Sequence, residues 1–170
     1  NIGYIGRLVP EKKVDIIIKS AKNFPQLNYH IIGDGPERSS LENLTKELGL
    51  KNVNFLGSQK NIPKLHKKID LLIYIRENEP FGISAIEALA SGIPVIANDT
   101  NELHYIIGKE KTGLVIKKSN VKQLKNAIHK IINENLEKYS KNAIEISQDY
   151  DSKKIVPNIL NIMSSKLNHP

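Results

Sequence analysis

An unbroken apolar run at residues 69–75, followed by a second one at residues 94–97, is the feature that most constrains the fold. The first run, Ile-Asp-Leu-Leu-Ile-Tyr-Ile, is rich in β-branched residues and does not alternate between polar and apolar positions. This pattern is typical of a parallel strand that is covered on both faces. A single helix is expected between the runs, from about Gly82 to Gly92. The sequence therefore predicts a strand, a polar loop, a helix and a second strand.

The helix between the two runs carries the clearest chemical signal. It is apolar nearly all round, so it is expected to be deeply buried. Its polar side chains, Ser84, Glu87 and Ser91, recur at spacings of three and four and share one face. Burying an unpaired carboxylate costs several kcal/mol, so Glu87 is expected to face a cleft, a cation or a hydroxyl-rich ligand. The first N–H groups of the helix, at Gly82 to Ser84, form a predicted phosphate cradle.

A second candidate site follows a strand expected at residues 2–5. Arg7 lies in the next loop, and Lys12 and Lys13 open a helix expected over residues 11–23. Two cations in a first turn oppose the helix dipole, so a nearby anion would explain them. Arg7 adds a planar fork that suits phosphate. The alternative is a pair of ordinary surface cations at a helix end.

The other elements complete an α/β pattern. Gly33 opens a tight turn that permits the close approach of a flat ligand. Leu56 is a candidate for lining a pocket, Phe55 is expected in the core, and His66 is interpreted as a surface residue. The alternation of strands and helices predicts a doubly wound parallel sheet. The remaining predicted strands are residues 27–32, 51–57 and 112–116 (the last at a sheet edge), and the remaining helices are residues 36–48, 62–68 and closing helices over about 120–168.

Composition narrows the choice of partners. The 170 residues suffice for one domain with a core of its own, and the chain is interpreted as a fragment because it begins with Asn1. The absence of cysteine fits a cytoplasmic protein. The net charge of +7 comes from scattered lysines without interleaved aromatics, which disfavours nucleic acid as a partner. The charge is interpreted as an ordinary solvated basic surface, and peripheral contact with an anionic membrane surface is the alternative.

Two segments resemble motifs of a known family. The block from Glu79-Pro-Phe-Gly to Glu87, with the small-residue helix and Gly-Ile-Pro-Val-Ile-Ala after it, resembles the E-x7-E signature of retaining glycosyltransferases of the GT-B fold, in particular family 4. The segment from Gly6 to Lys12 is similar to the family's Gly-Arg-Leu…Glu-Lys-Gly motif, with Lys13 in place of the last glycine. The resemblance covers nearly the whole chain. It implies that residues 1–170 form the C-terminal, nucleotide-sugar-binding half of a GT-B enzyme, with a Rossmann-like fold.

The resemblance also implies roles for individual residues. The catalytic candidates are Glu79, which would hold the transferred sugar, and Arg7 and Lys12, which would bind the donor diphosphate. Glu87 would hold the ribose hydroxyls. No metal or cofactor is implied, and the donor is itself the substrate. Near Glu102 the chain departs from the family, because Thr100-Asn101 replaces a Gly-Gly pair. The other candidate substrate-binding residues are Gly33, Leu56, Phe81, Gly82, Ile83 and Ser84.

The function implied is transfer of a sugar, of hexosyltransferase type, from a nucleoside-diphosphate sugar to a glycan or lipid-linked acceptor in polysaccharide biosynthesis. The acceptor would bind through an N-terminal domain that is absent from this chain, so the chain alone is expected to be inactive. The expected location is the cytoplasm, including the inner face of the membrane. The alternatives are a GT-B nucleotide-sugar epimerase and a non-catalytic nucleotide-binding module.

Overall fold

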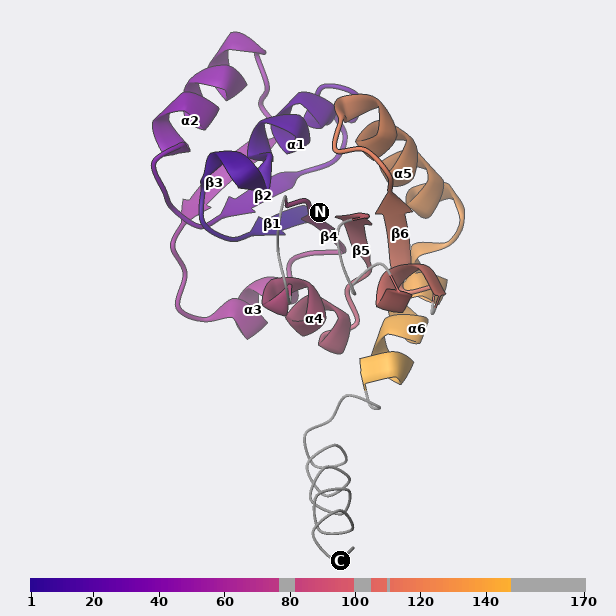
Figure 1. The fold of residues 1–170 in the computed structure, drawn as a ribbon. Helices are drawn as coiled ribbons and strands as arrows, with labels where there is room; N and C mark the ends of the chain where they lie inside the picture. Colours follow the sequence, from indigo (N-terminus) through magenta and orange to yellow (C-terminus); the bar gives the residue numbers. More distant parts are fainter. Residues whose placement is uncertain (77–81, 100–104, 110, 148–170) are drawn as a thin grey trace, which may run out of the picture.

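The computed structural model describes residues 1–76, 82–99, 105–109 and 111–147 (Figure 1). Within them, six parallel strands form one sheet in the order β3-β2-β1-β4-β5-β6. The order reverses between β1 and β4, as in doubly wound folds. The described elements are β1 (Ile2–Ile5), a 3-10 helix (Pro10–Lys12), α1 (Val14–Ala21), β2 (Tyr29–Ile32), α2 (Arg38–Glu47), β3 (Val53–Gly57), α3 (Ile62–His66), β4 (Leu71–Tyr74), α4 (Ile83–Ala90), β5 (Val95–Asn98), a π-helix (Tyr105–Lys109), β6 (Gly113–Ile116), α5 (Val121–Asn133) and α6 (Leu136–Ser147).

The helices cover both faces of the sheet. Helices α1, α2 and α5 lie on one face, and α3, α4 and α6 lie on the other (Figure 1). Two apolar clusters correspond to these layers: Ile17 and Ile128 belong to the first, and Leu89 and Ala143 belong to the second. Every residue of β4 and β5 is buried, because both of their faces are covered. The predicted fold class is confirmed, and β6 is an edge strand as expected.

Two helices differ from the prediction. The helix expected over residues 11–23 is divided, because Lys13 adopts a left-handed conformation (φ 49°, ψ 39°) between the 3-10 helix and α1. Helix α4 is not deeply buried: Ala85, Ala88 and Leu89 face the sheet, but the Ile83 side chain is 68% exposed. Apolar composition alone thus predicted too large a contact surface for α4.

The connections place the site. All six strands are parallel, so their carboxyl ends meet at one edge of the sheet. Open α/β sheets bind ligands in the crevice at that edge, where the strand order reverses. Here the crevice lies between the segments that follow β1 and β4. Arg7 and Lys12 follow β1, and Arg76 follows β4.

Candidate functional site

The loops after β1 and β2 pack directly against each other at the crevice. Gly33 has a φ of 136°, and a Cβ added there would lie 1.8 Å from the Gly6 carbonyl oxygen. A Cβ on Gly35 would lie 2.3 Å from the carbonyl oxygen of Leu8. Leu8 N–H in turn donates to the Asp34 carbonyl, at 2.9 Å. Gly33 was predicted to allow a flat ligand to approach closely. In the structure, the group that approaches Gly33 closely is the backbone of the loop after β1.

An open pocket of about 410 Å³ lies beside these loops, and Gly33 lines it together with Arg7. The Arg7 side chain is exposed. Leu56 does not line this pocket among the residues that the structure describes; it lies on β3 and is 37% exposed. Phe55, its neighbour on β3, packs against the core as predicted. The pocket is lined by Ile5, Gly6, Arg7, Ile32, Gly33, Asp34, Ser58, Gln59 and Ile62.

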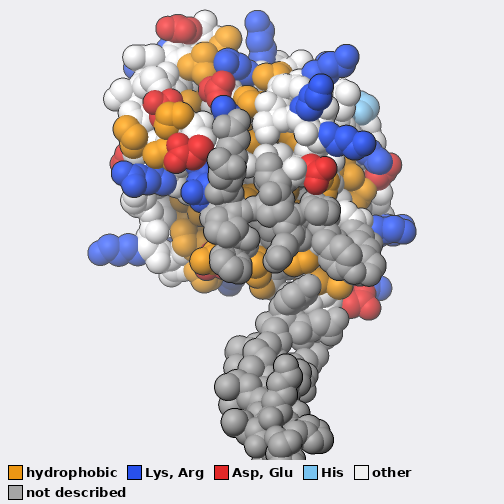
Figure 2. Space-filling view, viewed as in Figure 1, with side chains coloured by type: hydrophobic (Ala, Val, Ile, Leu, Met, Phe, Trp, Pro, Cys, Tyr) orange, Lys and Arg blue, Asp and Glu red, His pale blue; other side chains and the backbone are white. Residues whose placement is uncertain are grey.

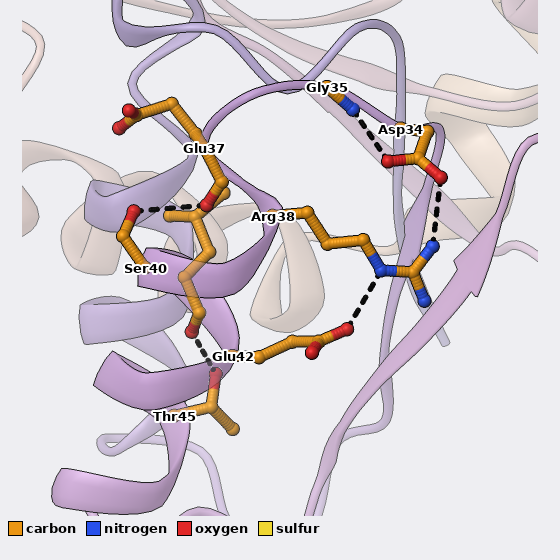
Figure 3. A network of polar contacts seen from close by, with 8 residues as sticks. Asp34, Gly35, Glu37, Arg38, Ser40, Glu42 and Thr45 are labelled. Carbon is orange, nitrogen blue, oxygen red and sulfur yellow. Dashed lines mark hydrogen bonds and ion pairs between the residues drawn. The ribbon is translucent and has the colours of Figure 1, made fainter.

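An ionic network fixes the rim of the pocket at Asp34 (Figure 3). Asp34 accepts a hydrogen bond from Gly35 N–H at 2.8 Å and a second from Arg38 Nη1 at 3.1 Å. Arg38 Nε also donates to Glu42 Oε1 at 2.8 Å. The Gly35 hydrogen bond and the Arg38 guanidinium hold the pKa of Asp34 below its usual value. Asp34 is therefore a fixed carboxylate at neutral pH.

Lys12 and Arg76 form a cluster of cations at the point where the strand order reverses. Lys12 Nζ lies 5.3 Å from the ring centroid of Tyr74, the last residue of β4. This geometry is a cation–π contact. Burial lowers the pKa of Lys12 to about 8, and the positive charge of Arg76 acts in the same direction. The negative charge of Glu11 has a smaller, opposite effect. Arg76 was not singled out from the sequence, although its place directly after a buried parallel strand was a usable signal.

Helix α4 brings the predicted phosphate cradle to the same edge of the sheet. Gly82 is its N-cap, in a left-handed conformation (φ 57°, ψ 45°) that glycine adopts without strain. Ile83 and Ser84 form the first turn, whose N–H groups have no partner within the helix. Glu87 lies one turn further on, and its side chain is exposed. Two other predicted residues, Glu79 and Phe81, lie outside the described residues.

His66 is a second correction. The side chain was expected at the surface, but it is only 5% exposed, between α3 and α4. His66 Nδ1 lies 2.8 Å from Ser91 Oγ, and Ser91 Oγ donates to the Glu87 carbonyl at 2.9 Å. Burial lowers the pKa of His66, and the charge of Glu87 acts against this effect. Ser91 thus joins the two helices and does not extend a ligand-facing stripe.

The structure brings together part of the predicted site. Arg7 and Gly33 share a pocket, and Lys12 lies across β1 from it, beside β4. Among residues 1–76, 82–99, 105–109 and 111–147, there is no group of three or more His, Asp or Glu side chains arranged to hold a metal ion. The helices of the described segments are also too short or too polar to cross a membrane. Lys and Arg side chains are scattered over the visible face, with Asp and Glu among them (Figure 2).

Comparison with known proteins identifies the class. Residues 1–149 match the family model of glycosyl transferases group 1. The chain therefore belongs to this family. It is 32% identical over 157 residues to an uncharacterized glycosyltransferase of Methanocaldococcus jannaschii, with 90% of this chain and 44% of that protein covered. It is 28% identical over 153 residues to the D-inositol 3-phosphate glycosyltransferase of Mycobacteroides abscessus, covering 85% of this chain and 34% of that protein.

Solved structures agree with the fold. The crystal structure of Anabaena HepE in complex with UDP superposes with a TM-score of 0.88 at 28% identity, covering 96% of this chain and 48% of that one. The UDP-glucose complex of the same protein gives a TM-score of 0.85, with the same identity and coverage. The chain thus spans between about a third and a half of the length of these proteins.

Proposed function

We propose that this chain is the donor-binding, C-terminal half of a retaining GT-B glycosyltransferase of family 4 that uses a nucleoside-diphosphate sugar. The observation that carries the proposal is the placement of Arg7 and Lys12 after β1, at the reversal of the strand order and beside an open pocket. Cations at this point suit a diphosphate, and the pocket has room for a nucleoside. The complexes of Anabaena HepE with UDP and with UDP-glucose support the same ligand class.

The proposed chemistry is stabilisation of the leaving diphosphate. Negative charge builds on this group as the sugar departs, and fixed cations and helix N–H groups lower the energy of that state. Arg7, Lys12 and the first turn of α4 supply them. Glu87 holds the ribose hydroxyls, and Glu79 positions the transferred sugar. The acceptor, a glycan or a lipid-linked sugar, binds to the other half of the full-length enzyme, in the cytoplasm or at the inner face of the membrane.

Separate substitutions of the two glutamates test this proposal. Glu87→Gln should weaken the binding of nucleoside diphosphate and nucleotide sugar alike by about tenfold, because a charged hydrogen bond to the ribose is lost. Glu79→Gln should leave diphosphate binding within about twofold and lower turnover in the full-length enzyme, because only the sugar contact is lost.

Titration calorimetry with UDP, GDP and ADP measures the first effect, and sugar transfer by the full-length enzyme measures the second. Glu47→Gln is the matched control, because Glu47 is exposed at the end of α2, away from the crevice. If Glu79→Gln abolishes diphosphate binding while Glu87→Gln does not, the two roles are assigned wrongly. If the unaltered chain binds none of the three diphosphates, the proposed function is wrong.

A further inference from the structure

Asn98 fixes the backbone of Arg76 beyond the end of strand β4. The Asn98 side chain is 5% exposed at the last position of β5. Its Oδ1 accepts a hydrogen bond from Arg76 N–H at 3.0 Å, and its Nδ2 donates to the Arg76 carbonyl at 2.8 Å. The last residue pair of the β4–β5 ladder is Tyr74 with Ala97. The amide thus continues the hydrogen bonding of the ladder after the strands have separated.

This bonding holds Arg76 close to Lys12. The Lys12 ammonium lies over the ring of Tyr74, two residues before Arg76 in the chain. The two cations are near enough for Arg76 to oppose the charged form of Lys12. Like charges held together in a half-buried place raise each other's energy, and a bound anion relieves that repulsion. The buried amide prevents the backbone of Arg76 from moving away from the crevice.

The order of the strands indicates which part of a ligand Arg76 meets. The pocket beside Arg7 lies at the ends of β1, β2 and β3, whereas Arg76 lies beyond β1, at the end of β4. A nucleoside in that pocket would extend its phosphates across β1 toward β4. The proximal phosphate would then lie nearer the pocket, and the distal phosphate would lie at Lys12 and Arg76.

We infer that Arg76 is a third cation of the donor site, that it binds the distal phosphate of the nucleoside diphosphate beside Lys12, and that Asn98 is the residue that positions it. This inference rests on the proposed function. The guanidinium fork can bind two phosphate oxygens at once, whereas the Lys12 ammonium acts as a point charge. Arg76 therefore distinguishes a nucleoside diphosphate from a monophosphate.

Titrations of the 170-residue chain with UDP and UMP test the role of Arg76. Arg76→Gln should lower the affinity for UDP by about tenfold and leave the affinity for UMP within about twofold of the unaltered chain. Arg76→Lys should recover part of the lost affinity for UDP. Lys22→Gln is the charge-matched control. It removes an exposed cation at the far end of α1 and should leave the affinities for UDP and UMP unchanged. Equal losses for both ligands, or no loss for UDP, would overturn the inference. If the unaltered chain binds neither UDP, GDP nor ADP, the proposed function itself has failed.

A double-mutant cycle tests the role of Asn98. Asn98→Leu removes both hydrogen bonds while keeping a side chain of similar volume. It should lower the affinity for UDP about fivefold without changing the affinity for UMP. Because Asn98 acts through Arg76, the double variant Asn98→Leu/Arg76→Gln should bind UDP as Arg76→Gln does. Losses that add would refute the positioning role. Circular dichroism checks folding, and Asn98→Ser takes the place of the leucine variant in the same cycle if that variant does not fold.

Discussion

Lys12 shows how burial changes the protonation of a single cation. Its ammonium lies over the Tyr74 ring, half-buried, and its pKa is lowered to about 8 by burial first and by Arg76 second. At neutral pH this lysine is therefore still mostly charged. A bound anion stabilises the charge of Lys12 more than it would stabilise the charge of an exposed lysine, because less water competes for the ammonium. The pKa of Lys12 should consequently rise when a diphosphate binds.

This difference predicts a pH dependence. Above the pKa of free Lys12, at about 8, binding must take up a proton, so the affinity for UDP should fall by about fivefold between about pH 7.5 and pH 9. The diphosphate does not cause the change, because its last ionisation lies near pH 6. In Lys12→Arg the side chain stays charged throughout, and the decline should disappear. Calorimetry across this range measures it, and an identical decline in both proteins would exclude Lys12 as its source.

Lys13 occupies a backbone conformation that favours glycine. Its φ of 49° lies in the left-handed region, which costs a residue with a Cβ roughly 1–2 kcal/mol. Lys13→Gly should therefore raise the free energy of unfolding by ~0.5–1 kcal/mol. Urea unfolding measures the change. Lys22→Gly is the control, because Lys22 has helical dihedral angles and should lose stability instead. Destabilisation by both substitutions would show that Lys13 has side-chain contacts that outweigh the strain.

At the level of elements, α3 and α4 are joined by a buried imidazole. Ser91 Oγ donates its proton to the Glu87 carbonyl, so it accepts one from His66 Nδ1–H, and Nε2 is the unprotonated nitrogen. Burial lowers the pKa of His66 below its usual 6.5. The unfolded chain then takes up a proton at a higher pH than the folded chain does. Stability due to neutral His66 is present above pH 6.5 and is lost as the pH falls below that value.

His66→Asn tests this linkage, because an asparagine amide can still donate to Ser91 but does not titrate. Between pH 7 and about pH 5, the melting temperature of the variant should fall by less than that of the unaltered chain. His129→Asn is the control; His129 is exposed on α5, and its substitution should leave the pH dependence unchanged. A pH dependence as steep in His66→Asn as in the unaltered chain would assign the acid sensitivity to other groups.

The elements also show what the sequence could predict. The buried runs identified β4 and β5 because parallel strands covered on both faces need continuous apolar residues. The division of the first helix at Lys13 was missed, since the left-handed position carries a lysine instead of glycine. His66 was misplaced because a lone histidine on a short helix gives no sign of its partner, Ser91, which is 25 residues away. Recognising Arg76 as a neighbour of Lys12 required knowing that β1 and β4 lie side by side in the sheet.

At the scale of the molecule, the chain has a complete sheet with helices on both faces and two apolar clusters of its own. Such a unit can fold without another domain. Its crevice, however, opens at one edge of the sheet, and the chain matches only 48% of the length of Anabaena HepE. Under the proposed function, the donor binds in this crevice, and transfer also requires an acceptor held opposite it.

The 170-residue chain alone should accordingly bind a nucleoside diphosphate and transfer no sugar. Under the proposed function, the residues that bind the diphosphate, among them Arg7, Lys12, Arg76 and the start of α4, all belong to this chain. Transfer also requires an acceptor oriented against the donor and a crevice from which water is excluded. Calorimetry with UDP, GDP and ADP measures binding, and incubation with radiolabelled nucleotide sugars and a panel of glycan and lipid-linked acceptors measures transfer, with the full-length enzyme as the positive control. Transfer by the chain alone to any acceptor would show that the second half of the enzyme is dispensable for the reaction. If the chain folds but binds none of the three diphosphates, the proposed function is wrong.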